Sequence, residues 1–541
     1  MVAGCLPRGL FFLDSEVLPV RIGRKKSPVK PYDTASRADL FAGSKDVFDA
    51  VVAELSGRRT ATLTHAQLEE LVAVRGRELL RQLLQDHLDL RAAREQQAVA
   101  LLHQAARGEV AGADGVARRR IEAGHHRLLA TIAGTVTVRR CAFRALGARN
   151  AYPADAALSL PAGRHSHGLA RLAVTETVRG SFDAAAAAIT ARCGKVIGKR
   201  QVEQLVVQGA ADIDAFYADR IPLPRTAGEL LVISVDGKGI VMRPGALRQA
   251  TARAAARHKN TFRTRLASGE KPCRKRMATV GVVYDAEPAP RRPHDVIAVP
   301  GGRHGHREVR AGPHASGKWL CGSVIAGPGQ VIASVFDHAE ARDPMHARTW
   351  VVLVDGARHQ LDLIRSQAAR RRARIHIVID LIHVLEYLWK AAWCLHAADD
   401  PAAEDWVATQ ALAILAGHAR HAAATIDAQA TTAGLSGDRR VGVNACVRYL
   451  TSNAAFLRYD RALTAGWPIA TGVIEGACRH LIGDRLQITG ARWGLAGAEA
   501  VLKLRALVSN GDLDAYWRYH LECEHHRVHQ TRYQDGYALT A

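Results

Sequence analysis

The sequence predicts a mixed α/β domain with helical regions on both sides. Short apolar runs of strand length occupy residues 231–235, 350–354 and 375–379, and segments with helical spacing separate the later ones. Before them, residues 64–105 repeat Leu and Val at intervals of three and four, as one face of a helix does. After them, residues 397–465 are rich in Ala and free of strand patterns. We therefore expect a central sheet between helical parts.

The charge balance indicates a polyanionic partner. The 541 residues contain 74 Lys and Arg against 52 Asp and Glu, which gives a net charge of +22. Hydrophobic residues make up 48% of the chain, so it can bury real cores and is not a disordered polycation. Nucleic acid is the usual partner of such a protein. The alternative is an Arg-rich proteome in which every protein is basic.

The cysteines and the apolar runs indicate a cytoplasmic protein. None of the nine cysteines forms a C-x-x-C pair, which is typical of a reducing compartment rather than of disulfides or a structural zinc site. No apolar run approaches the ~18 residues of a membrane span. Near the C-terminus, a possible zinc cluster lacks a second pair of ligands at zinc spacing, so we do not predict zinc there; its residues are Cys523, His525, His526 and His529.

The N-terminal half is expected to be a loose basic arm, residues 1–60, followed by a mainly helical region, residues 61–225, with a short strand at 134–144. Within it, residues 181–217 can form a helix, a glycine turn and a second helix that runs to Tyr217. This arrangement resembles a helix-turn-helix, although many helical pairs share it. The leading edge of the second helix would offer DNA three side chains, Lys199, Arg200 and Gln201.

The central part begins with two expected strands, at 231–235 and 240–242, followed by a long basic loop over residues 243–276. The loop is either solvated or a phosphate-binding segment that becomes ordered on DNA, and its position beside the strand that ends at Asp236 favours the second interpretation. Further expected elements are strands at 280–284, 350–354 and 375–379 and helices at 329–341 and 361–374.

Three acids lie where metal chemistry is plausible. Asp236 and Asp355 each end an expected strand, and Glu475 lies on a helix after the last strand. If the two strands are neighbours, their ends converge, and a helix packed across them adds the third carboxylate. Three hard oxygen ligands suit Mg²⁺, and two such ions can activate and stabilise the oxygens of a phosphodiester displacement. The alternative is that both Asp-Gly pairs are hairpin turns without chemistry.

Several blocks of the sequence resemble the ISKra family of bacterial insertion-sequence transposases, which are Mutator-like DDE enzymes. The C-terminal half contributes V-I-S-V-D-G-K-G-I-V-M-R (232–243), T-W-V-V-L-V-D-G-A-R-H-Q (349–360), I-V-I-D-L-I-H-V-L-E-Y-L-W-K-A-A (377–392) and T-G-V-I-E-G-A-C-R-H-L-I-G-D-R-L (471–486), with A-R-W (491–493). The N-terminal half contributes residues 76–91, 160–169, 179–183 and 198–202. The blocks occur in order over nearly the whole chain past residue 60.

The resemblance implies an RNase H-like catalytic domain that holds Mg²⁺ or Mn²⁺. Asp236 corresponds to the first acid of the family and Glu475 to the third. For the second acid we choose Asp355 over Asp380, because the second acid of such sheets follows the fourth strand, which residues 350–354 fit. Asp380 and His383 resemble the [C/D]-x-x-H signature of Mutator-like enzymes and are expected to be accessory; His383 could instead be a core histidine.

The resemblance also divides the chain. The RNase H-like domain would comprise residues 226–383 and 466–510, interrupted by a helical insertion, 384–465, and followed by a polar C-terminal tail, 511–541. The insertion contains three tryptophans that could stack on unpaired bases, but their helical spacing favours the core: Trp389, Trp393 and Trp406. Basic residues beside the acids could hold DNA phosphates or be solvated surface charges; they are Lys238, Arg274, Lys275, Arg276, Arg479, Arg485 and Arg492.

The expected function is therefore DNA transposition. The N-terminal half would recognise the terminal inverted repeats of the element, and the acids would cleave strands at its ends and join the 3′-hydroxyls to target DNA. Two ends must be joined, so a homodimer or higher oligomer on DNA is expected. Two alternatives stay open at this point: an RNase H-like nuclease without strand transfer, and an inactive DNA-binding relic of a transposon.

Overall fold

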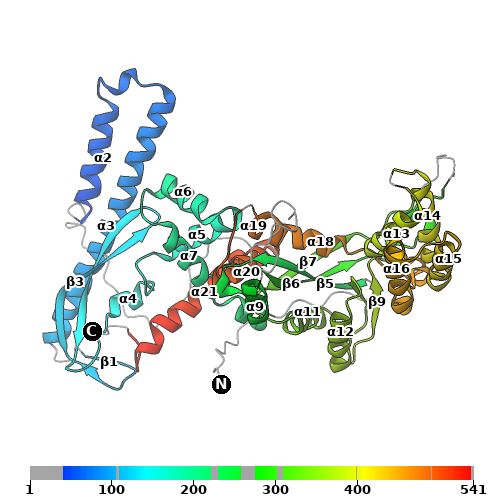
Figure 1. Ribbon diagram of the computed structural model, residues 1–541. Coiled ribbons are helices and arrows are strands. Elements are labelled where there is room, and N and C mark those ends of the chain that lie inside the picture. The colour runs from blue at the N-terminus through cyan, green and yellow to red at the C-terminus, as the bar shows by residue number, and fades with distance from the viewer. Residues whose placement is uncertain are drawn as a thin grey trace.

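The chain folds into three parts that follow one another along the molecule (Figure 1). A helical hairpin, a β-hairpin and a helical cluster form the first, a five-stranded sheet the second, and a helical bundle the third. The computed structural model describes residues 40–104, 109–220, 230–257, 274–300, 309–397, 399–488 and 490–537. Most of the predicted arm, residues 1–39, lies outside these ranges. No helix in the described ranges has both the length and the apolar character that crossing a membrane requires.

The first part begins with two antiparallel helices, α2 (Ala42–Leu55) and α3 (His65–Gln104). Near one end of the pair, Ser44 donates from its backbone N–H and its hydroxyl to Asp86, at 2.8 and 2.6 Å. Near the other end, Arg75 donates to Glu54 at 2.7 Å. The prediction of helix over 64–105 is confirmed, whereas the prediction of a loose arm to residue 60 is wrong for α2. The sequence did not predict α2, because the apolar side chains of this helix find a packing partner only in the folded chain, where α3 lies beside it.

A long β-hairpin follows, made of β3 (Arg120–Thr131) and β4 (Gly134–Arg144). Gly134 ends its two-residue turn with a φ of +130°, which glycine adopts without strain and other residues do not. The sequence predicted β4 and missed β3, because β3 carries adjacent His and Arg side chains in place of a clear apolar alternation. Val136 and Val138 pack with Leu88 of α3 in a small separate core.

Four helices complete the first part: α5 (His167–Arg179), α6 (Phe182–Cys193), α7 (Lys199–Gln208) and α8 (Ile213–Asp219). Ser181 caps α6 as its sequence predicts, since its hydroxyl accepts the N–H of Ala184 at 3.0 Å, and Gly194 ends the helix at a φ of +77°. The second predicted helix does not run to Tyr217. It ends at Gln208, and α8 begins after a short turn.

The central sheet has five strands in the order β7-β6-β5-β8-β9. The first three in the chain are antiparallel neighbours, and β8 and β9 run parallel to β5. Their bounds are β5 (Leu230–Val241), β6 (Lys275–Ala286), β7 (Ala315–Ser323), β8 (Thr349–Val354) and β9 (Ile375–Ile379). The mixed sheet was predicted with the right number of strands but two wrong assignments. The expected strands 231–235 and 240–242 are one strand, and β7 was missed.

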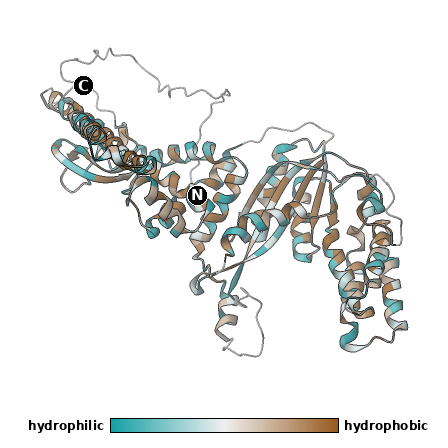
Figure 2. Cartoon of the chain, turned by 90° about the horizontal axis from the view of Figure 1, so that it is seen from above, coloured by the Kyte–Doolittle hydropathy of each residue, from teal (hydrophilic) through white to brown (hydrophobic). Residues whose placement is uncertain are grey.

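Helices cover both faces of this sheet, and the strands are hydrophobic along much of their length, with polar residues toward one end of β5, β6 and β7 (Figure 2). A Cβ on Gly281 of β6 would lie 2.3 Å from Val335 of α11 (Pro328–Arg342), and one on Gly322 of β7 would lie 3.5 Å from Leu502 of α20 (Leu495–Ser509). Gly281 pairs with the residue before Gly322, so the two glycines face opposite sides. At the β9 end of the sheet, α12 (Arg358–Arg371) connects the parallel strands β8 and β9.

The expected basic loop, residues 243–276, is wrong in part. It contains the helix α9 (Gln249–Arg257), and β6 already begins at Lys275; residues 258–273 lie outside the described ranges. The other short elements are β1 (Val110–Ala111), β2 (Ala117–Arg118), α4 (Pro153–Ala157), α10 (Pro293–Val296), α18 (Gly472–Cys478) and α19 (Asp484–Leu486).

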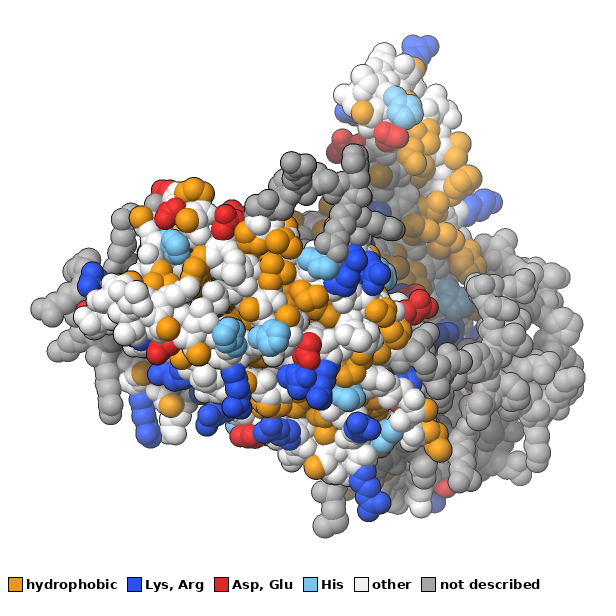
Figure 3. Space-filling view, turned by 90° about the vertical axis from the view of Figure 1, so that its right-hand side faces the viewer, with side chains coloured by type: hydrophobic (Ala, Val, Ile, Leu, Met, Phe, Trp, Pro, Cys, Tyr) orange, Lys and Arg blue, Asp and Glu red, His pale blue; other side chains and the backbone are white. Residues whose placement is uncertain are grey.

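The third part is a bundle of α13 (Leu381–Leu395), α14 (Ala402–Leu415), α15 (Ala419–Thr432), α16 (Val441–Ser452) and α17 (Tyr459–Thr464). Small residues let its helices approach closely: a Cβ on Gly442 of α16 would lie 2.1 Å from the backbone oxygen of Lys390 in α13. Seen from the side of the molecule on which this bundle lies, Lys and Arg gather in the lower half of the view (Figure 3). Trp393 is 51% exposed, so its expected place in the core is wrong; it stacks on Trp389, with ring centroids 5.2 Å apart.

The C-terminal segment is not a polar tail. Residues Leu513–Val528 form α21, which returns to the first part of the molecule. There Tyr516 and Trp517 are buried, and Asp212 accepts from His520 and from Arg527. The prediction of a polar tail was wrong because α21 buries its aromatic side chains against a region about 300 residues earlier in the chain, which no local pattern reveals.

Candidate functional site

Three acids lie at the same level of the sheet, Asp236 inside β5 and the other two directly after the parallel strands β8 and β9. Ser234 of β5 is in register with Leu353 of β8, and Asp236 and Asp355 each come two residues later. Val354 of β8 is in register with the last residue of β9, and Asp380 comes next in the chain. Because paired parallel strands rise by the same distance per residue, the three residues lie side by side at the carboxyl-terminal edge of the sheet, where neighbouring strands are ~4.8 Å apart.

Neither Asp-Gly pair is a hairpin turn. Asp236 and Gly237 lie inside β5, which continues to residue 241, and Asp355 and Gly356 lead from β8 into a helix. Gly356 has a φ of +92°, and Asp355 Oδ1 accepts the N–H of Ala357 at 3.1 Å, so this acid opens a tight turn. The alternative that both Asp-Gly pairs are hairpin turns is therefore wrong.

Asp236 and Asp355 are both partly exposed at this edge. The carboxylate of Asp236 accepts the N–H of Gly237 at 2.6 Å and lies beside the thiol of Cys478. Burial, followed by the charge of Asp236, raises the pKa of that thiol well above its usual range. The backbone oxygen of Asp355 accepts the hydroxyl of Tyr449 at 2.9 Å, so the helical bundle holds the end of β8.

Asp380, His383 and Glu475 form a compact group. One ligand atom from each lies within 4.8 Å of the other two, and among the described residues this is a group that could hold a metal ion. Asp380 Oδ2 accepts from the backbone N–H of His383 at 3.2 Å and lies 3.1 Å from its Nδ1. Thr471 links the group, because its N–H donates to Asp380 and its hydroxyl to Glu475, at 2.9 and 3.0 Å.

The Asp380–His383 pair is electrostatically coupled. Burial raises the pKa of Asp380, but the hydrogen bonds from His383 and Thr471 outweigh it, so that pKa lies below its ordinary value. The hydrogen bond to Asp380 raises the pKa of His383, and the charge of Asp355 acts in the same direction. The pair therefore favours a carboxylate beside an imidazolium.

Glu475 reaches the sheet edge from α18, which packs against β5 and β6. The helix therefore packs on the strand that carries Asp236, as predicted, but its second neighbour is β6 and not the expected strand before Asp355. Cys478, one turn after Glu475, feels the charges of both Asp236 and Glu475. A five-residue π-helical stretch, Arg479–Gly483, continues α18; such stretches are frequent at functional sites.

The structure thus divides the predicted acids into two sets. Asp380 is fully buried and already accepts three hydrogen bonds, which nearly exhausts the roughly four acceptor positions of a carboxylate. Asp236, Asp355 and Glu475 are more exposed and retain free acceptor positions. Among the described residues, neither Asp236 nor Asp355 belongs to a group of three ligand atoms that all lie within 4.8 Å of one another. A pair of Mg²⁺ ions does not require such close ligand atoms. If the ions lie ~4 Å apart and each carboxylate oxygen lies ~2.1 Å from its ion, the carboxylates can be up to about 8 Å apart.

Most of the proposed DNA-contacting residues are accessible. Exposed or half-exposed side chains occur at Lys199, Arg200, Gln201, Lys238, Arg274, Lys275, Arg479 and Arg492. Lys199 forms an ion pair with Asp183 of α6 at 2.5 Å. The residues therefore remain candidates, with Lys199 partly neutralised.

One of the proposed DNA contacts is wrong. Arg485 is 3% exposed, donates from Nε to the backbone oxygen of Thr177 at 3.1 Å, and lies beside the rings of Phe182 and Trp493. Burial lowers its pKa to about 10. Arg276 is half-exposed and stays a candidate, although its guanidinium group already donates to the backbone oxygens of Val324 and Ala246. The sequence alone could not separate Arg485 from surface arginines, because its hydrogen-bond partner lies far away in the chain.

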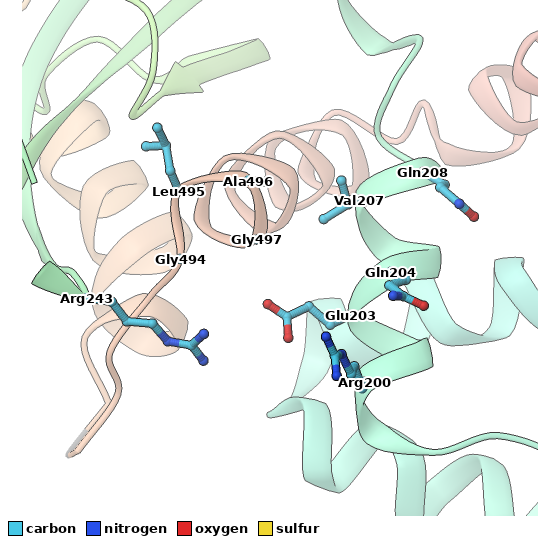
Figure 4. Close-up of a pocket in the computed structure, with 10 residues that line it drawn as sticks. All are labelled: Arg200, Glu203, Gln204, Val207, Gln208, Arg243, Gly494, Leu495, Ala496 and Gly497. Carbon is cyan, nitrogen blue, oxygen red and sulfur yellow. The ribbon is translucent and has the colours of Figure 1, made fainter. Parts of the chain in front are cut away.

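The second helix of the predicted helix-turn-helix faces the central part across a pocket of about 670 Å³ (Figure 4). Arg200 and Glu203 extend from α7 toward the pocket, and Arg243, just after β5, approaches it from the other side (Figure 4). The N-terminus of α20 forms a third wall, with Gly494 as the residue that precedes the helix. Glu203 offsets part of the positive charge at this place.

Sequence reasoning missed three residues that shape the site. Thr471 bridges two of the acids, Cys478 lies beside Asp236, and Tyr449 holds the end of β8 from the inserted bundle. Thr471 and Cys478 flank Glu475 in the chain and could have been suspected from that position. Tyr449 lies 94 residues from its partner and carries no local signal. The chain matches no family model, and no curated protein matches it.

Proposed function

We propose that this protein is a DNA transposase with an RNase H-like catalytic domain, active in the bacterial cytoplasm on the DNA of an insertion sequence. The observation that carries the proposal is the common level of Asp236 and Asp355 at neighbouring parallel strands, with Glu475 on a helix that packs against β5 and β6. The strand order β7-β6-β5-β8-β9, with three antiparallel strands and two parallel ones, supports the same fold.

The donors suit a hard divalent cation. Asp236, Asp355 and Glu475 offer carboxylate oxygens, which Mg²⁺ and Mn²⁺ prefer. Such ions would lower the pKa of a bound water or hydroxyl and stabilise charge on the departing oxygen. Asp380 and His383 are positioning residues in this account. Asp380 caps α13 and holds Thr471, and Thr471 in turn orients Glu475.

Several features favour a transposase over the alternatives. A nuclease without strand transfer needs no recognition of DNA ends, yet about 200 residues of helices and hairpin precede the sheet, with exposed basic side chains on α7. An inactive relic needs no free acceptor positions on its acids, and all three acids retain them. Because two element ends must be joined, we propose that the protein acts as a dimer or higher oligomer.

The test is cleavage of a labelled duplex that carries the inverted repeats flanking the gene, with Mg²⁺ or Mn²⁺. Wild type should cut at the element end, Asp355→Asn should lose cutting by about a thousandfold or more, and Asp380→Asn should retain a measurable fraction. All three proteins must bind the duplex equally. If Asp380→Asn is dead and Asp355→Asn still cuts, the second metal ligand is Asp380. Binding without any cutting by wild type would support the relic.

A further inference from the structure

A basic pocket lies on the β-hairpin of the first part, far along the chain from the acids. It has a volume of about 490 Å³ and is lined by His126, Arg127, Leu128, Arg140, Ala162 and Arg164. None of these residues belongs to the predicted helix-turn-helix or to the sheet edge. Three guanidinium groups in one pocket are the side chains best suited to bind a phosphate or carboxylate by paired N–H donors.

Two of these guanidinium groups are held rigidly. Arg140 is 10% exposed, lies 4.2 Å over the ring of Tyr152, and donates to Asp155 at 2.9 Å. Arg127 is 18% exposed, lies 3.8 Å from the same carboxylate, and donates to the backbone oxygen of Gly163. The Nε atom of Arg140 is buried and has no hydrogen-bond partner. Such a donor is costly unless an acceptor arrives.

The third guanidinium group is brought in by backbone pairing. The N–H of Ala130 in β3 donates to the backbone oxygen of Arg164, and the N–H of Ser166 donates back to Ala130, both at 2.8 Å. These bonds attach residues 164–166 to the hairpin edge, so Arg164 stands beside the pocket without depending on side-chain partners. Its own side chain is exposed.

Negative charge at the pocket is smaller than positive charge. Asp155 lies between Arg127 and Arg140, and Glu95 approaches from behind β4, where it accepts the N–H of Cys141 at 2.9 Å. Burial raises the pKa of Glu95 to about 6, so this group is not fully charged in mildly acidic solution. Three arginines against these two acids leave an excess of positive charge for a ligand.

We propose that this pocket binds a phosphate of the DNA backbone, as a second contact of the first part with DNA besides α7. The choice of DNA rests on the proposed function; the geometry itself calls for an oxyanion with several acceptor oxygens. A phosphate contact would fix the position of the hairpin on the duplex without reading its sequence.

The test is the affinity for a labelled duplex, measured by fluorescence anisotropy at several salt concentrations without divalent cations. Arg164→Gln should weaken binding about three- to tenfold and reduce the slope of log affinity against log salt by about one. Arg139→Gln is the matched control. Arg139 neighbours Arg140 on the opposite face of the strand, where it pairs with Asp89, and its loss should change neither quantity appreciably.

Other outcomes separate this proposal from the proposed function. If wild type binds the duplex and Arg164→Gln binds it with the same affinity and salt slope, the pocket proposal is wrong and the transposase stands. If inorganic phosphate raises the melting temperature of wild type more than that of Arg164→Gln while duplex binding is equal, the pocket binds a free anion and the DNA assignment is wrong. If wild type binds no duplex at any salt concentration, both proposals fail.

Discussion

At the residue scale, Asp355 and Asp380 differ in what their carboxylates already do. Asp380 is buried with three hydrogen bonds, so Asp380→Asn leaves a donor group facing donors and should cost about 1–3 kcal/mol of unfolding free energy. Asp355 is half-exposed and accepts one backbone N–H, so Asp355→Asn should change stability by under about 0.5 kcal/mol. Urea denaturation of both variants measures this. Equal losses would contradict the proposed division between ligand and positioning residues.

Glu95 gives a prediction about pH. Its pKa is raised by burial to about 6 in the folded protein, against 4.5 unfolded, so the folded state binds the extra proton. The contribution of Glu95 to the free energy of unfolding is therefore greatest below about pH 4.5. It falls by about 2 kcal/mol as the pH rises through about 6 and does not recover above that pH. Glu95→Gln cannot ionise and should be more stable relative to wild type at pH 7.5 than at pH 4.5. Denaturation at the two pH values measures the difference, and a constant difference would contradict the assignment.

At the element scale, the close contact between α13 and α16 should tolerate no side chain. A Cβ on Gly442 would lie 2.1 Å from a backbone oxygen and 2.8 Å from the sulfur of Cys394, so Gly442→Ala should cost about 1–3 kcal/mol. Gly76→Ala is the control, because Gly76 lies inside α3 with no atom within 4 Å of an added Cβ, and this change should stabilise by up to about 1 kcal/mol. Thermal denaturation distinguishes the two variants. If both are stabilised or both are destabilised, α13 and α16 are not packed as closely as the structure shows.

Elements with a complete local signal were predicted correctly. β8 is buried on both faces and reads as a continuous apolar run, β9 is apolar apart from His376, and α6 has both its Ser cap and its terminating Gly in the sequence. β3 and α21 were missed because their buried side chains are mixed with His and Arg, and their partners lie far away in the chain. The acids could be proposed from the sequence because each follows a recognisable apolar run or lies in the first turn of a helix. Thr471 and Tyr449 could not, since they act through contacts that only the folded chain creates.

At the scale of the whole molecule, Arg485 joins the first part to the central sheet. It donates to Thr177 of α5 and packs against Phe182 of α6 and Trp493. Arg485→Met should therefore destabilise the protein by about 1–3 kcal/mol and leave the DNA affinity of the folded fraction unchanged. Arg492→Gln, at an exposed position seven residues later, should leave stability within about 0.5 kcal/mol and weaken DNA binding. Denaturation and anisotropy measure both, and the reverse pattern would restore Arg485 as a DNA contact.

The whole molecule can be tested in one reaction, since the proposed function includes the joining of DNA ends as well as their cleavage. A labelled duplex that ends in the 3′-hydroxyl of the element should become covalently attached to a plasmid in the presence of Mg²⁺ or Mn²⁺. Wild type should form this product, and chelation of the metal or Asp236→Asn should abolish it while duplex binding persists. If wild type binds and cuts the duplex but never joins it to the plasmid, the protein is a nuclease and the central claim is wrong.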